Sequence, residues 1–425
     1  MAMKRPRIDW MLVLLLIPML AGAAPLPLTD DEAAFLAGHW RDPIAPQGLV
    51  PAGRSPVEAS LAPKDCGTCH VQQYADWQTS LHSKSMGPGV LGQVVDMVDN
   101  DPGTAQVCWR CHTPLAEQQD VLFQAGEGWQ RNAKFDSALQ GQGLICAGCH
   151  VRGQQRFGPP RKGAAKVSGA VTDAGLPHGG FVAQTAFEKS AFCKGCHQFT
   201  ADGYALNGKL LENTYEEWLA SSYPQQGVQC QDCHMPDRRH LWRGIHDPEM
   251  VRRAIRVNVD APARPLRSGE TLQVGISVAN VGAGHYFPTY VTPKVTVQAV
   301  LLDEAGAPLP ASLQEAVIGR EVSLDLSQEL FDTRIAPGDT RTLSYVQDVP
   351  TEGLRLRVRV EVDPDHFYAR FYQATLAADG ADKGKAMLQQ ALDNALAGRF
   401  VVFEKIFGGT TAAKVPTANA EVDGG

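Results

Sequence analysis

The sequence predicts an α+β protein, in which a mainly α-helical, loop-rich region precedes a β-sandwich and a carboxy-terminal helix. All ten cysteines of the 425-residue chain lie before residue 250, so the chain changes character there. Apolar and polar residues then alternate from Ala254 to about Leu376, with Gly and Pro between the runs, as in half-buried strands. Leu388, Leu392 and Leu396 recur with the spacing of one helix face.

These changes in composition predict the domain boundaries. Residues 24–60 are rich in Pro, Ala and Gly and are expected to form an extended lead-in. The cysteine-bearing region spans residues 61–250, and the β-sandwich spans 251–378. A carboxy-terminal helix is expected over 379–408, and the small polar residues of 409–425 predict a disordered tail.

The cysteines form five C-x-x-C pairs, and a histidine directly follows each pair. We number the motifs one to five along the chain: Cys66/Cys69/His70, Cys108/Cys111/His112, Cys146/Cys149/His150, Cys193/Cys196/His197 and Cys230/Cys233/His234. Two thiols at this spacing can add to the two vinyl groups on one edge of a haem, and the adjacent histidine then binds the iron. Zinc ribbons and disulfides also use C-x-x-C, but neither requires the histidine. The sequence therefore predicts five covalently bound haem c groups.

The amino terminus has the pattern of a secretory signal peptide over residues 1–23. Basic residues precede the apolar run Met11–Leu20, and Ala21-Gly22-Ala23 is typical of a cleavage site. The run is shorter than the roughly 20 residues that span a membrane, although a retained signal anchor is the alternative. Thioether attachment of haem takes place outside the bacterial cytoplasm, so we expect a periplasmic protein, or alternatively one outside the cell or on its outer surface.

The net charge of −7 bears on partners rather than on fold. It disfavours nucleic acid and suits docking to a redox protein partner with a basic surface. No stable membrane insertion is expected after signal cleavage.

Alternation is clearest in three segments behind the motifs, 272–278, 295–301 and 356–362. About seven such segments in roughly 120 residues predict a sandwich of immunoglobulin-like type. This sandwich has no cysteine, so its core must hold it together without a disulfide. It could serve homo-oligomerisation or surface docking, which the fold alone does not decide.

Seven histidines remain outside the motifs, and five of them are predicted to bind iron opposite a motif histidine: His82, His178, His240, His246 and His285. His82 follows His70 by twelve residues, which span about 18 Å in a helix, so it should serve a neighbouring haem. His240 and His246 follow motif five closely, whereas His178 and His285 lie in glycine-rich loops. The alternative for each is a surface or turn histidine.

The other two histidines are spares. His366 lies among strand-like aromatics and is expected to pack rather than bind, and His39 lies in the lead-in, where it could be flexible. Met86 and Met235 lie near motifs but are more typical of core filling.

The motif region resembles the cytochrome c-554-like family of multihaem cytochromes over roughly residues 60–300. The resemblance rests on motif one followed by Trp77-x-x-Ser80-x-His82, on motif five followed by Met235-Pro236, His240 and His246, and on Gly284-His285-x-x-Pro288-Thr289. It implies haems packed in near-contact pairs, mostly with two histidine ligands, that carry electrons between periplasmic or surface partners. The type member has four haems, one of them five-coordinate, whereas this chain has five motifs.

Two functions follow from these patterns. The first is an electron carrier without catalytic residues, in which haem spacing and ligands set the potentials. The alternative is a multihaem oxidoreductase that acts on a small nitrogen or sulfur compound at a five-coordinate haem. The supply of histidines and the absence of a C-x-x-C-K variant favour the carrier.

Overall fold

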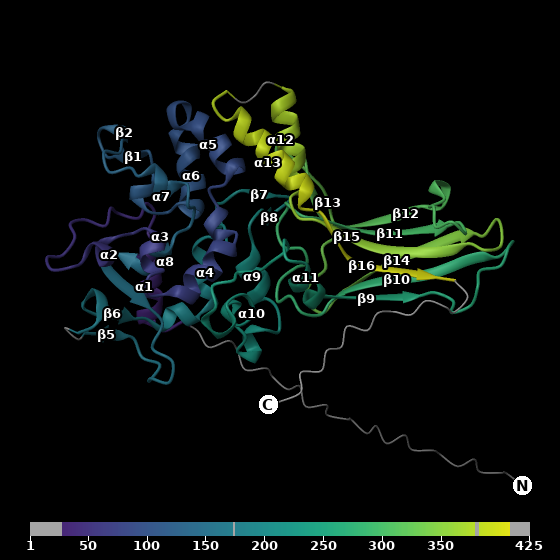
Figure 1. The fold of residues 1–425 in the computed structure, drawn as a ribbon, viewed down its shortest axis with the longest axis horizontal. Coiled ribbons are helices and arrows are strands. Elements are labelled where there is room, and N and C mark those ends of the chain that lie inside the picture. The colour runs from purple at the N-terminus through teal and green to yellow at the C-terminus, as the bar shows by residue number, and fades with distance from the viewer. Residues whose placement is uncertain (1–27, 173–174, 379–381, 409–425) are drawn as a thin grey trace, which may run out of the picture.

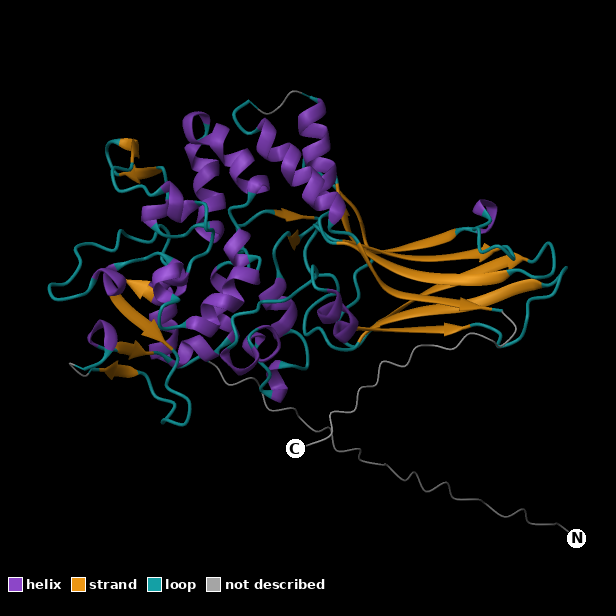
Figure 2. Cartoon of the chain, in the orientation of Figure 1, coloured by secondary structure: helices purple, strands orange, loops and turns teal. Residues whose placement is uncertain are grey.

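The computed structural model describes residues 28–172, 175–378 and 382–408 (Figure 1). The predicted signal peptide and the tail 409–425 lie outside the described residues. Short helices and loops gather at one end of the molecule, and long strands extend from them at the other (Figure 2). The predicted α+β architecture is confirmed.

The motif region is built from short helices. They are α1 (Asp30–His39), α2 (Pro56–Ala59), α3 (Pro63–Cys66), α4 (Val71–Thr79), α5 (Pro88–Asn100), α6 (Pro102–His112), α7 (Ser137–Gln140), α8 (Cys146–His150), α9 (Thr214–Leu219), α10 (Cys230–His234) and α11 (Pro248–Ala254). Motifs three and five each form a whole helix, and motif two ends α6. Motif one bridges α3 and α4, and motif four begins inside the 3₁₀ turn η5 (Ser190–Gly195) and ends just after it.

Small sheets accompany these helices. Their strands are β1 (Val121–Gln124) with β2 (Gly128–Arg131), the four-stranded set β3 (Val151–Arg152), β4 (Gln155–Gly158), β5 (Gly169–Val171) and β6 (Phe181–Ala183), and the pair β7 (Ala205–Leu206) and β8 (Lys209–Leu210). The strands β1, β2, β5 and β6 lie at the outer edge of this region (Figure 1). No helix among the described residues is long and apolar enough to cross a membrane.

The lead-in 24–60, predicted to be extended, contains the helices α1 and α2. Each begins with a capping box, in which Thr29 pairs with Glu32 and Ser55 pairs with Glu58. These side chains satisfy the first free N–H groups of each helix, which outweighs the Pro- and Gly-rich composition. Composition alone therefore misjudged this segment.

The β domain is a sandwich of two antiparallel sheets. One sheet has the order β14-β10-β9 and the other the order β13-β12-β11-β15-β16. The strands are β9 (Ile255–Asp260), β10 (Thr271–Asn280), β11 (Lys294–Leu302), β12 (Gln314–Val322), β13 (Glu329–Asp332), β14 (Thr340–Asp348), β15 (Arg355–Asp363) and β16 (Phe400–Phe407). Alternate residues of β10, β11 and β15 point into one apolar core, as their sequence pattern predicts.

Two elements of the carboxy-terminal part differ from expectation. The aromatic segment expected to be strand-like is helix α12 (His366–Ala377), because its rings stack at a spacing of four residues, Phe367 on Phe371 and Tyr368 on Tyr372. The range 379–408 holds helix α13 (Lys385–Ala397) but ends in strand β16, which pairs antiparallel with β15. The alternation in β16 is short and was hidden behind a helical pattern.

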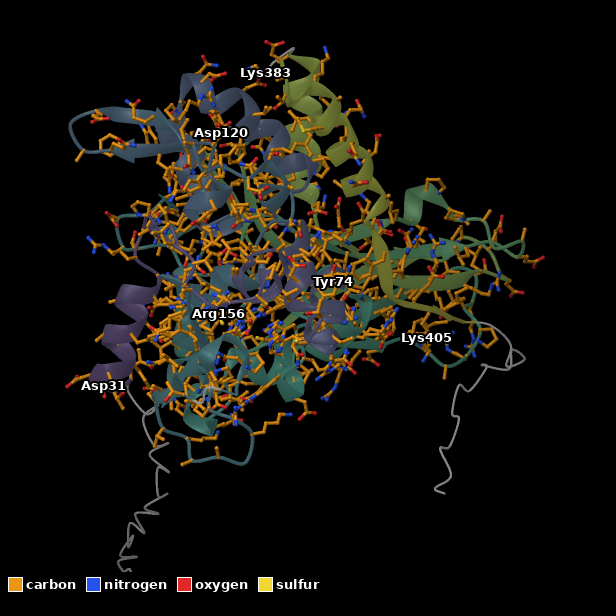
Figure 3. All side chains as sticks on the ribbon, turned by 60° about the vertical axis from the view of Figure 1, so that its left-hand side comes forward. Asp31, Tyr74, Asp120, Arg156, Lys383 and Lys405 are labelled. Atoms are coloured by element: carbon orange, nitrogen blue, oxygen red, sulfur yellow. The ribbon has the colours of Figure 1, made fainter. Side chains whose placement is uncertain are left out.

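The helices α12 and α13 return the chain to the motif region, where they pack beside α5 (Figure 1). Asp96 of α5 accepts the backbone N–H groups of Asp382, Lys383 and Gly384. Gly384 lies so close to α5 that a Cβ atom there would clash with the carbonyl oxygen of Gly92. Figure 3 shows Lys383 at this end of the molecule, far from Lys405 on the β domain.

Candidate haem-binding sites

The five motifs come together in one region, and thiols of different motifs touch. The thiols of Cys66 and Cys146, of Cys111 and Cys196, and of Cys193 and Cys230 lie close enough to shift each other's pKa values. The motifs therefore form neighbouring pairs: one with three, two with four, and four with five.

Motifs three and four are also neighbours. Hydrogen bonding and burial raise the pKa values of Cys193 and Cys196, and the nearby charge of Cys149 adds to both shifts. Burial raises the pKa of Cys149 itself to about 11. The motif sites thus follow the order one, three, four, five, with motif two beside motif four.

Cys69 of motif one differs from the other nine cysteines predicted to bind haem. Its side chain is exposed, whereas each of the others is partly buried. It lies in the surface turn between α3 and α4, where the hydroxyl of Thr68 contacts its Sγ atom at 3.8 Å. This exposure disagrees with the enclosed setting that the other predicted haem-binding thiols share. Cys69 stays a predicted attachment residue, because an exposed thiol can still add to a vinyl group.

Three motif histidines face a second imidazole at the separation that a shared metal ion requires. The ring centres of His150 and His240 lie 6.2 Å apart, those of His197 and His82 lie 6.3 Å apart, and those of His234 and His285 lie 6.4 Å apart. Two imidazoles on opposite sides of one metal ion have ring centres about 6.3 Å apart, since each metal–nitrogen bond is about 2.0–2.1 Å and each nitrogen lies about 1.1 Å from its ring centre. The geometry fits three six-coordinate irons.

Carbonyl oxygens orient most of these rings through the Nδ1 atom. The contacts are His112 to Ser85 at 2.5 Å, His150 to Phe157 at 2.8 Å, His234 to Arg243 at 2.7 Å, His240 to Arg238 at 3.0 Å and His285 to Tyr286 at 2.8 Å. A carbonyl oxygen only accepts, so Nδ1 carries the proton and Nε2 keeps its lone pair. Such a hydrogen bond is the usual partner of a metal-binding histidine.

The surroundings of these histidines also suit iron binding. Burial lowers the pKa of His82 to about 3 and the pKa values of His150 and His234 to about 4, which keeps the rings neutral. Each of these three side chains is surrounded by protein atoms but keeps part of its own surface accessible. All ten cysteines are free thiols. The residues present therefore fit covalently held haem.

His178 lies near motif one. It sits in the 3₁₀ turn η3 (Pro177–Gly179) with a positive φ of 61°, and its Nδ1 atom is buried without a hydrogen-bond partner. Burial is the main cause that lowers its pKa, and the charge of Arg156 and, less strongly, that of His70 add to this effect. Among the described residues, no ring contact joins His178 or His70 to another imidazole.

His246 is the one predicted ligand that the structure engages elsewhere. Its Nε2 atom lies 3.1 Å from both carboxylate oxygens of Asp365. Among the described residues, no ring contact joins it to a motif histidine, and none joins His112 to any imidazole. The histidine of motif two therefore has no facing imidazole among the described residues, unlike the histidines of motifs three, four and five.

The two spare histidines have structural roles. His39 is buried rather than flexible, and its Nε2 atom lies 2.9 Å from the carbonyl oxygen of Cys149. His366 begins helix α12 and lies 3.4 Å from both Glu321 and Asp363, so it makes polar contacts rather than packing in a strand.

Sequence reasoning missed the residues that hold the predicted distal histidines. Trp242 contacts the rings of both His82 and His240, at centre distances of 4.6 and 4.9 Å. Asp76, Glu58 and Glu217 accept backbone N–H groups of distal-histidine segments far away in sequence. Only the presence of Trp242 beside His240 gave a local signal, and it was not used.

Residues 65–150 match the family described as cytochrome c554 and c-prime. No curated protein matches this chain in sequence. The chain has the fold of a penta-heme cytochrome c552 from Thermochromatium tepidum, with a TM-score of 0.52 and 18% identity over 83% of this chain and 100% of that one. The CARDB domain of the PF1109 protein from Pyrococcus furiosus is 15% identical over 26% of this chain and 68% of its own, with a TM-score of 0.17, which is too low to bear on the fold.

Proposed function

We propose that this chain is a multihaem c-type cytochrome, a pentahaem electron carrier that works outside the cytoplasm. The observation that carries this proposal is the array of facing imidazole pairs at adjacent motifs. Bound haem iron supplies one-electron chemistry, and the chain sets its ligands, spacing and burial. Facing imidazoles leave those irons no open position for a substrate.

The number of haems is the first test. Ten cysteines in five motifs support five thioether-bound haems. Intact mass after expression in a host able to attach haem should exceed the mass of the processed chain by five haems. A smaller number of attached haems would show that some motifs do not bind haem.

We propose His82, His240 and His285 as distal ligands of the haems at motifs four, three and five, and His178 as that of motif one. Each of the variants His82→Ala, His240→Ala and His285→Ala should convert one haem to a high-spin or ligand-exchanged form and leave all haems attached. Paramagnetic resonance of the oxidised variants tests this. A spectrum equal to that of the parent protein would remove that histidine from the ligand set.

His246 stays a proposed distal ligand, and we assign it to the haem at motif two by elimination. It would have to bind through Nδ1 because Asp365 takes Nε2. Asp365 would then act as the carboxylate partner of a metal-binding histidine. His246→Ala should create one high-spin haem if this assignment holds.

A second candidate function is an oxidoreductase that acts on a small nitrogen or sulfur compound. The residues around motif two support it. His112 faces no imidazole among the described residues. The charge of nearby Cys108 contributes to the raised pKa of the buried Tyr368 phenol. Burial raises the pKa of Tyr368, so the phenol keeps its proton and could donate it. A stoichiometric high-spin haem in the parent protein, unaffected by His246→Ala, would favour this function over the carrier.

The periplasm, a redox protein partner and docking or self-association through the β domain are also proposals. Cell fractionation tests the location, with the outer surface as the alternative. The net charge of −7 supports a partner with a basic surface, so electron exchange should slow as ionic strength rises.

A further inference from the structure

The histidine that faces motif five comes from the β domain. His285 lies in the loop that follows strand β10, whereas His234 ends helix α10 of the motif region. Their ring centres lie 6.4 Å apart with nearly parallel planes, at an angle of 15°. The position of His285 therefore depends on how the β domain docks.

Glu217 of helix α9 joins this loop to the motif region, beside a hydrogen bond between the hydroxyls of Thr214 and Thr289. Its carboxylate accepts the backbone N–H of Tyr286 and the hydroxyl of Thr289, each at 3.1 Å. Its other oxygen accepts a hydrogen bond from Arg334 of the β domain at 2.9 Å. One buried side chain thus holds two residues that follow His285 in the loop, Tyr286 and Thr289.

The pair of Glu217 and Arg334 is closed to water. Their side chains are 4% and 5% exposed. A buried charge that loses its partner is strongly destabilising, so separating the two domains here is unfavourable. Asp332 also pairs with Arg334, at 2.9 Å, which keeps the guanidinium in place.

The rest of the loop is fixed from the β-domain side. The side-chain amide of Asn280 donates to the carbonyl oxygen of His285 at 2.9 Å, and Nδ1 of His285 contacts the carbonyl oxygen of Tyr286. Gly284 lies against Trp218 and Tyr223, and a Cβ atom there would come within 3.2 Å of the Tyr223 ring. Glu217 therefore acts on a loop with little remaining freedom.

The same arrangement occurs at two other distal histidines. Asp76 accepts the backbone N–H of His240 at 3.0 Å and pairs with Arg239 at 2.7 Å. Glu58 accepts the backbone N–H of His178 at 2.8 Å. At three sites a carboxylate distant in sequence holds the main chain of a distal histidine, which indicates a shared role.

We propose that Glu217 is the positioning residue for His285, so that ligation of the haem at motif five is conditional on docking of the β domain through Glu217 and Arg334. This inference rests on the proposed assignment of His285 as a distal ligand. Glu217 acts on the loop backbone and touches neither the imidazole nor the haem.

The test counts the equivalents of carbon monoxide that the reduced full-length holoprotein binds, because carbon monoxide takes an iron whose distal ligand is free. Glu217→Ala should bind one equivalent more than the parent protein and add one high-spin signal when oxidised. Glu217→Gln keeps an acceptor for Tyr286 and should give a partial increase. Unchanged binding in both variants would overturn the proposal.

Two controls separate positioning from general loosening. Arg320→Met removes another buried cation between the domains, one that holds the hairpin β7–β8 and makes no contact with the His285 loop. It should bind no extra carbon monoxide. Asp76→Ala should affect the haem at motif three instead, and an effect of Arg320→Met equal to that of Glu217→Ala would contradict a specific role for Glu217.

Two further variants cover the remaining outcomes. If Glu217→Ala yields no folded holoprotein, the double variant Glu217→Gln with Arg334→Met removes both charges together and should still bind additional carbon monoxide; parental binding would count against the proposal. His285→Ala distinguishes the positioning role of Glu217 from the assignment of His285 as a ligand. If it changes the haem signals and the Glu217 variants do not, only the positioning role fails, whereas an unchanged His285→Ala removes the ligand assignment itself.

Discussion

The two regions of this molecule are held together in different ways. The β domain has one continuous apolar core, which runs from Val251 through the alternating residues of β10, β11 and β15 to Val362. The motif region has only separate small clusters, one around Trp77 and Ile145 and another around Val94 and Trp109. A sandwich with such a core can fold on apolar burial alone, whereas the motif region needs further stabilisation that attached haem can supply.

Removal of all haems should have the largest effect, and it tests whether the motif region depends on haem more than the β domain does. Protein made without haem attachment should lose protection from amide hydrogen exchange in α6, α8 and α10, because the apolar clusters of the motif region are small and separate. Strands β10, β11 and β15 should stay protected. Equal protection of both regions in the haem-free protein would show that the motif region is self-sufficient.

A cavity in the sandwich core tests how far the β domain depends on its apolar core. Leu356→Ala, at a position with no exposed surface, should lower the free energy of unfolding of the β domain by about 2–5 kcal/mol. The visible spectrum of the haems should not change. Denaturant unfolding followed by absorbance and by circular dichroism separates the two, with Val346→Ala at an exposed position as the control.

A smaller effect concerns the acid Glu212, which belongs to the motif region. Burial raises its pKa to about 8, and the charge of Glu217 adds to the shift. The folded state therefore holds a proton between the unfolded pKa near 4.5 and pH 8, so stability should fall across this window as pH rises, by on the order of 1 kcal/mol per pH unit. Glu212→Gln should flatten this slope in unfolding measurements at several pH values; a slope that persists would assign it to other groups.

The smallest effect concerns the contact between the regions. Arg320 donates to three carbonyl oxygens of the segment 206–210 and to Glu329. Arg320→Met should lower stability by about 1–3 kcal/mol, since the carbonyl groups lose partners while Glu329 keeps its ion pair with Lys209. Thermal unfolding should then show two separate transitions in place of one, and a single unshifted transition would show that the contact contributes nothing.

Much of the architecture could be predicted because its signals are local. The C-x-x-C-H motifs depend on five adjacent residues, and the alternation in β10 and β15 follows from the period of a strand. The segments α12 and β16 were misjudged for the opposite reason. Phe367 and Phe371 suit a strand by residue type but stack four apart in a helix, and β16 becomes a strand by pairing with β15.

The distal histidines show where prediction from sequence reached its limit. His82, His240 and His285 were proposed from their setting, and each faces a motif imidazole, but which motif each one faces was not predictable. His246 was proposed on the same grounds and faces Asp365. The difference lies in contacts such as Asp76 to His240, which join residues 164 positions apart.

The spacing of residues along the chain is enough to specify haem attachment and the strands of the sandwich, because thioether chemistry and backbone periodicity act over a few neighbouring residues. The exposure of Cys69, the pairing of imidazoles, the order of the motif sites and the presentation of His285 by a separate domain depend on three-dimensional packing. We expect buried carboxylates such as Glu217 and Asp76 to hold the predicted distal histidines in place, since a carboxylate without its partners is too costly inside the protein.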